Sequence, residues 1–184
     1  MDSEAAFSAS LRKLGLEHVD LYLIHAPWPW TAIGTDHTAG NIEVWKVFEE
    51  LYSAGRTRSI GVSNFSVDDL EKLTAATEVV PHANQIRWFV GNTQEDVTAW
   101  CQAHGVLVEG YSPLATGQLL EDGALDEVAQ RVGRTPAQVA IRYLLEKGVL
   151  PLPKSVTPKR IAENAQVHFT LDAEAIATLD AIQD

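Results

Sequence analysis

The chain has 184 residues with 14 lysines and arginines against 25 aspartates and glutamates, so its formal net charge is −11 and its pI is near 4.9. An acidic surface repels phosphate backbones and anionic lipids, which argues against a nucleic-acid or membrane partner. Hydrophobic residues make up 46% of the chain, enough for the core of one domain spanning residues 1–184. No apolar run approaches the ~20 residues of a membrane span.

The chain start and the cysteine content bear on the setting in which the protein works. Residues 1–4 are acidic where a signal peptide would be basic, and no apolar segment follows them. Cys101 is the single cysteine, so an intramolecular disulfide and a cysteine-based metal site are both excluded. We therefore expect a cytoplasmic protein, and we expect no metal centre.

Hydrophobic periodicity predicts helices and strands that alternate along the chain. Predicted helices cover residues 3–14, the stretch from Trp45 to Tyr52 that stops at Gly55, 94–104, 124–132 and 172–182, and further helices begin at Ser66, Thr135 and Thr157. Predicted strands cover residues 19–24, 57–62, 83–89, 106–111 and 149–152. Each strand is followed by one or two helices.

This alternation predicts an α/β fold with a parallel sheet built from right-handed βαβ units. Two architectures remain open at this point. An open doubly wound sheet usually carries a glycine-rich first turn, and the chain contains neither G-x-G-x-x-G nor G-x-x-x-x-G-K-[ST]. A (β/α)₈ barrel needs eight strands and typically ~250 residues, whereas five strands are predicted here.

Polar residues end every predicted strand, which favours the barrel. In a barrel the carboxyl ends of the strands share one rim, and this rim is the face that carries the active site. The alternative is that strand ends are polar because loops begin there. The polar residues at the five strand ends are His25; Ser63 and Asn64; Gln85 and Arg87; Tyr111 and Ser112; and Lys154 and Ser155.

The last strand end is the sharpest of these signals. Three of the 14 basic residues, Lys154, Lys159 and Arg160, fall within seven positions of an otherwise acidic chain, where a helix is predicted to begin. Free N–H groups, a hydroxyl cap and nearby cations together form an anion site, most plausibly for phosphate. The alternative is a solvated basic turn.

The histidines other than His25 lack ligand spacing such as H-E-x-x-H. We interpret them as surface residues; they are His18, His37, His82, His104 and His168. His25 differs because it directly follows an apolar strand and precedes a proline.

Five segments carry motifs whose order and spacing extend over the whole chain. They are LGLEHVDLYLIH (14–25), RSIGVSNF (58–65), NQI (84–86), YSPL (111–114) and PKSVTPKRIAEN (153–164). Together they resemble the aldo-keto reductase family, and within it the bacterial branch similar to 2,5-diketogluconate reductases. The resemblance implies a (β/α)₈ barrel that binds NADPH in extended form without a Rossmann domain and reduces aldehydes or ketones to alcohols.

The resemblance also assigns roles to the residues of the rim. His25 matches the catalytic histidine that orients and polarises the substrate carbonyl. Ser63, Asn64 and Gln85 would hold the nicotinamide carboxamide, whose donors and acceptors a hydroxyl and two amides can match. Tyr111 would stack on the nicotinamide ring. The other implied cofactor contacts are Ser112 and Leu114 along the pyrophosphate, Lys154, Ser155, Thr157 and Arg160 at the adenosine 2′-phosphate, and Glu163 and Asn164 at the adenine end.

The substrate side is less well defined by the motifs. Trp28 and Trp30, on the loop after His25, are expected to form a wall of the substrate pocket, and packing within the loop or core is the alternative. After NQI the family usually continues with an acidic residue, an aromatic residue, histidine and proline, whereas this chain reads RWFV at 87–90. This departure bears on substrate preference rather than on cofactor binding.

The family's proton-donating tyrosine, with its aspartate and lysine partners, belongs to barrel strands two and three, and the chain begins at the helix before the fourth. Three of the four catalytic residues of the family are therefore absent. Strand alternation places Leu21 and Leu23 on the side of His25, and directs Asp20 and Tyr22 to the helices. We expect an N-terminally truncated barrel that is a C-terminal fragment or pairs with another chain.

Three functions remain open from the sequence. The first is an NADPH-dependent carbonyl reductase acting on a small aldehyde or ketone, represented here in part. The second is a non-catalytic NADPH-binding module. The third is a phosphate-binding barrel lyase in which Lys154 forms a Schiff base, although a neighbouring Arg160 indicates a solvated anion site instead. The exposed edges of a partial sheet also predict self-association.

Overall fold

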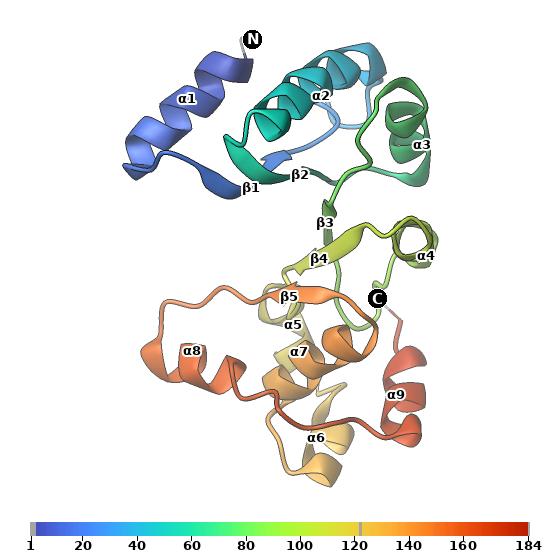
Figure 1. Ribbon diagram of the computed structural model, residues 1–184. Coiled ribbons are helices and arrows are strands. Elements are labelled where there is room, and N and C mark those ends of the chain that lie inside the picture. The colour runs from blue at the N-terminus through green and yellow to red at the C-terminus, as the bar shows by residue number, and fades with distance from the viewer. Residues whose placement is uncertain (1–2, 122, 184) are drawn as a thin grey trace. The chain divides into compact units, whose positions relative to one another are not determined.

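The computed structural model describes residues 3–121 and 123–183, in which helices and strands alternate (Figure 1). The strands are β1 (Val19–Ile24), β2 (Thr57–Ser63), β3 (Ala83–Arg87), β4 (Leu107–Tyr111) and β5 (Leu150–Leu152). The helices are α1 (Ser3–Leu14), α2 (Thr38–Ser53), α3 (Val67–Ala76), α4 (Glu95–Ala103), α5 (Gln118–Glu121), α6 (Asp126–Val132), α7 (Pro136–Glu146), α8 (Pro158–Asn164) and α9 (Ala173–Asp180), with a 3₁₀ turn, η1, at Ala115–Gly117. Among these described helices, none combines the length and the apolar character that crossing a membrane requires.

The strands form one five-stranded sheet in the order β1-β2-β3-β4-β5, so each strand lies beside its neighbour in sequence. The pairing is parallel, with Ser63 beside Gln85 and Tyr111 beside Leu152. Parallel neighbours joined by helices are βαβ units. The predicted α/β class with five parallel strands is confirmed.

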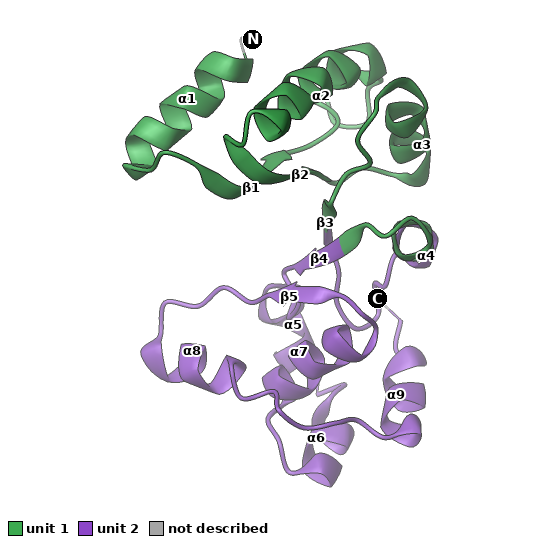
Figure 2. Cartoon of the chain, viewed as in Figure 1, with its two compact units in different colours: residues 1–85, 99–107 green, residues 86–98, 108–184 purple. Residues whose placement is uncertain are grey.

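The chain divides into two compact units (Figure 2). Unit 1 comprises residues 1–85 and 99–107, and unit 2 comprises residues 86–98 and 108–184. The predicted nicotinamide and substrate residues belong to unit 1, whereas Tyr111 and the basic segment belong to unit 2.

Unit 1 packs α1, α2 and α3 against one side of β1 and β2 (Figure 1). Tyr22 of β1 points to this side, with its ring centroid 4.8 Å from those of Phe7 in α1 and Phe48 in α2. Trp45 of α2 is fully buried, and its indole N–H donates to the Val79 carbonyl at 3.0 Å. Since burial of each such ring contributes ~1.5–3 kcal/mol, these aromatic contacts fix the helices on the sheet. Tyr22 faces the helices as the alternation predicts.

Unit 2 is organised around the fully buried Tyr143 of α7. Its ring lies 5.8 Å from that of Trp88, and its hydroxyl donates to Asp180 of α9. Lys147 Nζ lies 2.7 Å from Asp180 Oδ1. Burial opposes ionisation of Asp180, but the hydrogen bonds from Lys147 and Tyr143 outweigh it and lower the pKa of this carboxyl. Burial raises the pKa of Tyr143, and the adjacent Asp180 raises it further. The phenol therefore serves as a fixed donor that ties α9 to α7.

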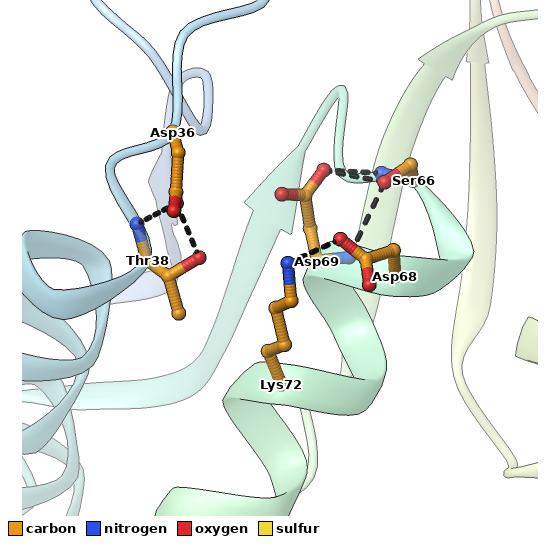
Figure 3. A network of polar contacts seen from close by, with 6 residues as sticks. All are labelled: Asp36, Thr38, Ser66, Asp68, Asp69 and Lys72. Carbon is orange, nitrogen blue, oxygen red and sulfur yellow. Dashed lines mark hydrogen bonds and ion pairs between the residues drawn. The ribbon is translucent and has the colours of Figure 1, made fainter.

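Side-chain caps explain where several helices begin. Ser66 accepts from the Asp69 N–H while the Asp69 carboxylate accepts from the Ser66 N–H, a capping box at the start of α3 (Figure 3). Thr135 and Gln138 form the same reciprocal pair at the start of α7. Each such cap stabilises a helix by roughly 1 kcal/mol. Both predicted starts are confirmed.

The prediction at Thr157 is correct for the proline but not for the cap. Pro158 occupies the first turn of α8, yet the Thr157 side chain makes no capping hydrogen bond to a described residue. Its ψ of 115° differs from the 172° of Ser66 and the 154° of Thr135, which both form capping boxes. The Thr157 N–H instead donates to Ser155 Oγ at 3.2 Å.

Most other boundaries agree with the predictions to within two residues, but α2 begins at Thr38, seven residues before the predicted start at Trp45, and one stretch was missed. The strand predicted over 83–89 ends at Arg87, because residues 89–92 turn back in an antiparallel bridge. The elements η1 and α5 were not predicted. Ser112 just before η1, and Ala115 and Thr116 within it, all have positive φ, a conformation that non-glycine side chains rarely adopt.

Candidate functional site

The ends of β2 and β3 bring together the three residues predicted to hold a carboxamide. Ser63 is the last residue of β2 and lies beside Gln85 of β3. Ser63 Oγ donates to the Gln85 carbonyl at 2.8 Å, and the Asn64 N–H donates to the same carbonyl at 2.9 Å. Parallel pairing thus joins the Ser63 hydroxyl and the Asn64 N–H to the backbone carbonyl of Gln85.

Asn64 links this cluster to His25. Its φ of 60° lies in the left-handed region, which asparagine tolerates better than most residues. In this conformation Asn64 Nδ2 donates to Ser63 Oγ at 3.0 Å and to the His25 carbonyl at 3.2 Å. The predicted catalytic histidine therefore joins the predicted nicotinamide residues in unit 1.

Aromatic side chains border the His25 ring. The His25 and Trp30 centroids lie 5.4 Å apart at 66°, and the Trp30 and Trp28 centroids lie 5.2 Å apart at 84°. Such edge-to-face pairs contribute ~0.5–1.5 kcal/mol beyond area burial. Trp30 is 55% exposed and is therefore not a core residue. The exposed Trp30 and the half-buried Trp28 form an aromatic surface beside the histidine, where the substrate wall was expected.

Asn84 is a site residue to which the sequence assigned no role. Its side chain is fully buried, and Nδ2 donates to the Phe65 carbonyl at 3.0 Å. Its Oδ1 has no hydrogen-bond partner among the described residues. Because Phe65 directly follows Asn64, this bond holds the turn that carries Asn64. The NQI motif contained the signal, but only Gln85 was interpreted from it.

Unit 2 contains an open cavity of about 810 Å³ at the ends of β4 and β5. The Tyr111–Leu152 pairing brings the segments after these two strands together. The cavity is lined by Ser112, Pro113, Leu114, Thr116, Gly117, Leu120, Glu121, Ala137, Leu152, Pro153, Lys154, Ser155, Arg160, Glu163 and Asn164. Seven of these were predicted as cofactor contacts: Ser112, Leu114, Lys154, Ser155, Arg160, Glu163 and Asn164.

Two predicted contacts are not part of the lining. Tyr111 is half-buried at the end of β4 and immediately precedes the cavity segment. Thr157 is exposed in the turn before α8.

The cavity carries two cationic side chains. Lys154 and Arg160 are exposed, and neither forms an ion pair within the described ranges 3–121 and 123–183. Glu121 and Glu163 also line the cavity, so its charge is mixed rather than uniformly positive. A doubly charged phosphate would find a guanidinium and an ammonium here.

Gln138 supports this cavity from α7, and the sequence analysis missed it. Its side chain is 96% buried, and Nε2 donates to the carbonyls of Glu163 at 3.2 Å and Gln166 at 3.3 Å. These bonds fix the end of α8, which carries Glu163 and Asn164. The capping pattern Thr135-x-x-Gln138 located this residue but pointed to a local role only.

The segment that departs from the family pattern is mostly buried. Trp88, Phe89 and Val90 are each at most 1% exposed, and the Trp88 indole N–H donates to Thr98 Oγ1 at 3.0 Å. Arg87 is exposed and its guanidinium lies 4.7 Å from the centroid of the Phe89 ring. Only Arg87 of this segment is thus presented to solvent.

The polar residues before α2 and α3 are structural. Asp36 Oδ1 accepts from the Thr38 N–H at 2.9 Å and from its hydroxyl at 2.7 Å, and these bonds lower the pKa of Asp36 (Figure 3). Lys72 Nζ lies 2.6 Å from Asp68 Oδ2, which raises the pKa of Lys72.

Across the described residues, no group of three or more histidine, cysteine, aspartate or glutamate side chains is placed to hold a metal ion.

The histidine predictions hold for four of five residues. His18, His37, His104 and His168 are exposed. His82 was predicted to be a surface residue, which is wrong. It is half-buried, its Nδ1 lies 3.1 Å from both the N–H and the carbonyl oxygen of Ile60, and its ring lies 5.1 Å from Tyr52. Partial burial of the His82 ring is possible because its Nδ1 can form a hydrogen bond with the backbone of Ile60 in β2.

The chain resembles characterised reductases over nearly its whole length. It is 40% identical over 179 residues to a glyoxal reductase of Bacillus subtilis, covering 97% of this chain and 62% of that protein. It is 41% identical over 173 residues to the methylglyoxal reductase DkgA of Escherichia coli, covering 92% of this chain and 60% of that protein. The chain therefore spans about three fifths of the length of these curated relatives.

Solved structures give the same picture. An aldo/keto reductase from Brucella melitensis superposes with a TM-score of 0.89 at 38% identity, covering 97% of this chain and 66% of that one. A silkworm aldo-keto reductase complexed with NADPH superposes with a TM-score of 0.89 at 36% identity, covering all of this chain and 60% of that one. The aldo/keto reductase family model matches residues 2–184. The chain belongs to the aldo/keto reductase family, with five parallel strands of its (β/α)₈ fold.

Proposed function

We propose that residues 1–184 belong to one NADP-dependent oxidoreductase domain that reduces aldehydes or ketones to alcohols. The cavity of unit 2 carries this proposal, because seven of its lining residues are those expected to contact the cofactor. The names of the relatives, glyoxal reductase and methylglyoxal reductase, and the NADPH-bound silkworm structure point in the same direction.

In this proposal the cavity holds the adenosine and pyrophosphate parts of NADPH. Lys154 and Arg160 pair with the 2′-phosphate, assisted by the hydroxyl of Ser155 and by Thr157 in the same turn. Ser112 and Leu114 lie along the pyrophosphate, and Glu163 and Asn164 contact the adenine end. The two cations favour NADPH over NADH, since NADH lacks the 2′-phosphate.

The nicotinamide end is assigned to the cluster in unit 1. Ser63, Asn64 and Gln85 match the donors and acceptors of a primary carboxamide. Tyr111 stacks on the nicotinamide ring and selects the face that reacts. NADPH, when bound, supplies the hydride that reduces the carbonyl. His25 orients the carbonyl oxygen, and Trp28 and Trp30 cover the substrate.

No tyrosine of the chain is assigned to proton donation, so we propose that the chain by itself lacks full activity. Tyr22 packs between Phe7 and Phe48, and Tyr143 is buried and bonded to Asp180. Tyr52 lies on α2, and Tyr111 is assigned to stacking. The aspartate and lysine partners of the family tyrosine are likewise not matched by any motif here.

The test is a titration of the purified chain with NADPH and with NADH, followed by quenching of tryptophan fluorescence. We expect saturable binding with NADPH favoured. Lys154→Ala and Arg160→Ala should each weaken NADPH binding about tenfold and leave NADH binding nearly unchanged. Lys159→Ala is the matched control, because Lys159 is exposed in the same turn but does not line the cavity. Equal weakening by all three variants would contradict the assignment.

The second candidate is a non-catalytic NADPH-binding module. It is favoured because the tyrosines of the chain are engaged in packing, hydrogen bonding or the proposed stacking and none is assigned to proton donation. Aldehyde-dependent loss of NADPH absorbance separates the two functions: a measurable rate supports the reductase, and binding without turnover supports the module. The lyase hypothesis has less support because Lys154 is exposed, whereas a Schiff-base lysine depends on desolvation. Failure of borohydride to trap a carbonyl substrate on Lys154 would exclude it.

We also propose self-association through the edges of the sheet. Within the described residues β1 pairs only with β2, and β5 pairs only with β4. An edge strand presents unpaired backbone groups that another strand can satisfy. Sedimentation velocity across a range of chain concentrations should therefore show reversible dimers or larger species, and a single monomer boundary at all concentrations would refute this.

A further inference from the structure

The loop after His25 has few ways to move. Pro27 and Pro29 fix their own φ angles, and the Ala32 N–H donates to the Pro29 carbonyl at 2.8 Å. The His25 carbonyl is already held by Asn64. A further variable near Trp28 is the orientation of the peptide plane between Pro27 and Trp28, which influences the direction in which the indole leaves the backbone.

Asn41 holds that peptide plane. It lies in the first turns of α2, where its own N–H donates to the His37 carbonyl at 2.9 Å. Its side-chain Nδ2 donates to the Pro27 carbonyl at 2.9 Å across 14 residues of sequence. The backbone of Asn41 is thus fixed by the helix, and its amide reaches across to the one carbonyl of the Pro27–Trp28 peptide.

The contacts continue from this peptide to the histidine. Trp28 meets Trp30 edge-to-face at 5.2 Å, and Trp30 meets His25 at 5.4 Å. Because Trp30 is 55% exposed, little surrounding protein holds it in place. The geometry of the aromatic wall therefore depends on the orientation of the peptide that carries Trp28, and Asn41 holds this peptide.

We propose that Asn41 is a positioning residue, whose side-chain amide fixes the Pro27–Trp28 peptide and thereby holds Trp28 and Trp30 edge-to-face beside His25. The role of this wall in carbonyl binding rests on the proposed function, whereas the placement of the indoles does not. Asparagine suits the task because a short side chain on the helix must supply a donor. Aspartate has almost the same shape but offers only acceptors, which would repel the carbonyl.

The first test is circular dichroism of the purified chain, because two indoles held at a fixed angle give an exciton couplet. The couplet is defined as the part of the spectrum lost in Trp28→Phe. We expect Asn41→Asp and Asn41→Ala to lose most of it while keeping a cooperative thermal transition. The control is Glu43→Ala, which alters an exposed residue of the same helix and should retain the couplet.

An unchanged couplet in both Asn41 variants would overturn the proposal, and so would the absence of a couplet in the unmodified chain. If the variants do not fold, the side-chain amide signals of Asn41 in the unmodified, ¹⁵N-labelled chain decide. Slow exchange with water of an Asn41 Nδ2 proton supports the hydrogen bond, whereas exchange of both protons at the rate of a free amide refutes it.

A second readout applies where aldehyde reduction is measurable. Asn41→Asp should then raise KM for the aldehyde severalfold and leave kcat and the Kd for NADPH within twofold, because the wall contacts only substrate. A purely structural role would instead lower the thermal midpoint without changing KM. If the couplet is lost on mutation but the unmodified chain does not bind NADPH, the positioning role stands and the proposed function fails.

Discussion

The hydrogen bond from Tyr143 to Asp180 offers a clean perturbation of unit 2. Tyr143→Phe removes only the hydroxyl oxygen. The ring contact with Trp88 at 5.8 Å and the position of Lys147 Nζ, 5.3 Å from the ring centroid, are both retained. The Lys147–Asp180 ion pair is also retained. The variant therefore reports on the phenol–carboxylate bond between α7 and α9.

The expected loss follows from the charge and exposure of the acceptor. A hydrogen bond to a charged group contributes roughly 1.5–3 kcal/mol. The Asp180 side chain is 43% exposed, so water replaces part of the lost bond and places the cost near the lower end, at about 1.5 kcal/mol. For a chain of this length 1 kcal/mol shifts Tm by roughly 2–4 °C, so we expect a decrease of about 3–6 °C.

Urea unfolding at neutral pH, followed by tryptophan fluorescence, measures this loss. Tyr52→Phe is the control, since Tyr52 is 36% exposed on α2, and its loss should stay below about 0.5 kcal/mol. In the background of Asp180→Asn the effect of Tyr143→Phe should shrink, because the acceptor is no longer charged. A loss below about 0.3 kcal/mol in the unmodified background would refute the reasoning.

Three further predictions follow from burial and charge. Gly110→Ala should cost about 1–3 kcal/mol, because the added Cβ would lie 2.7 Å from Leu144 Cδ2 and 3.1 Å from Val149 Cγ1; equal urea midpoints would contradict this. Burial raises the pKa of Cys101 to about 11, so a thiol reagent at pH 8 should react only after unfolding, and rapid labelling of the native chain would be inconsistent. The pKa of Asp180 is lower in the folded chain than in the unfolded chain, so its carboxylate stabilises the fold above the unfolded pKa of ~3.9, and this stabilisation is lost as pH falls through the folded pKa. Asp180→Asn should therefore reduce the dependence of the free energy of unfolding on pH below about pH 5. An unchanged slope would oppose this.

Much of the fold was accessible from sequence because its signals are local. Strand positions followed from short apolar runs, and the capping boxes at Ser66 and Thr135 marked two helix starts. The meeting of Ser63 and Gln85 followed from parallel topology, in which neighbouring strands end at the same edge. Of the predicted basic cluster, Lys154 and Arg160 line the cavity of unit 2, and Lys159 does not; the role of this cluster as an anion site stays a prediction.

What the sequence did not reveal depends on partners distant along the chain. A glutamine on a helix is expected to be exposed to solvent, but the side-chain amide of Gln138 donates hydrogen bonds to the carbonyls of Glu163 and Gln166. These bonds permit its burial. His82 is drawn inward by the backbone of Ile60. The left-handed residues at Ser112 and within η1 carry no composition signal, because Ala115 is not a residue that favours positive φ. Such conformations are imposed by tertiary packing and cannot be read from local preference.

The strand order of the sheet has a consequence for how the molecule forms. Because each strand lies beside its neighbour in sequence, every pairing closes a single crossover, which carries one helix between the earlier strands and several helices between β4 and β5. The entropy of loop closure grows slowly with length, so successive closures have similar cost. No pairing skips a strand, so the sheet can grow one strand at a time. Each new strand can then dock on the edge left by the previous one.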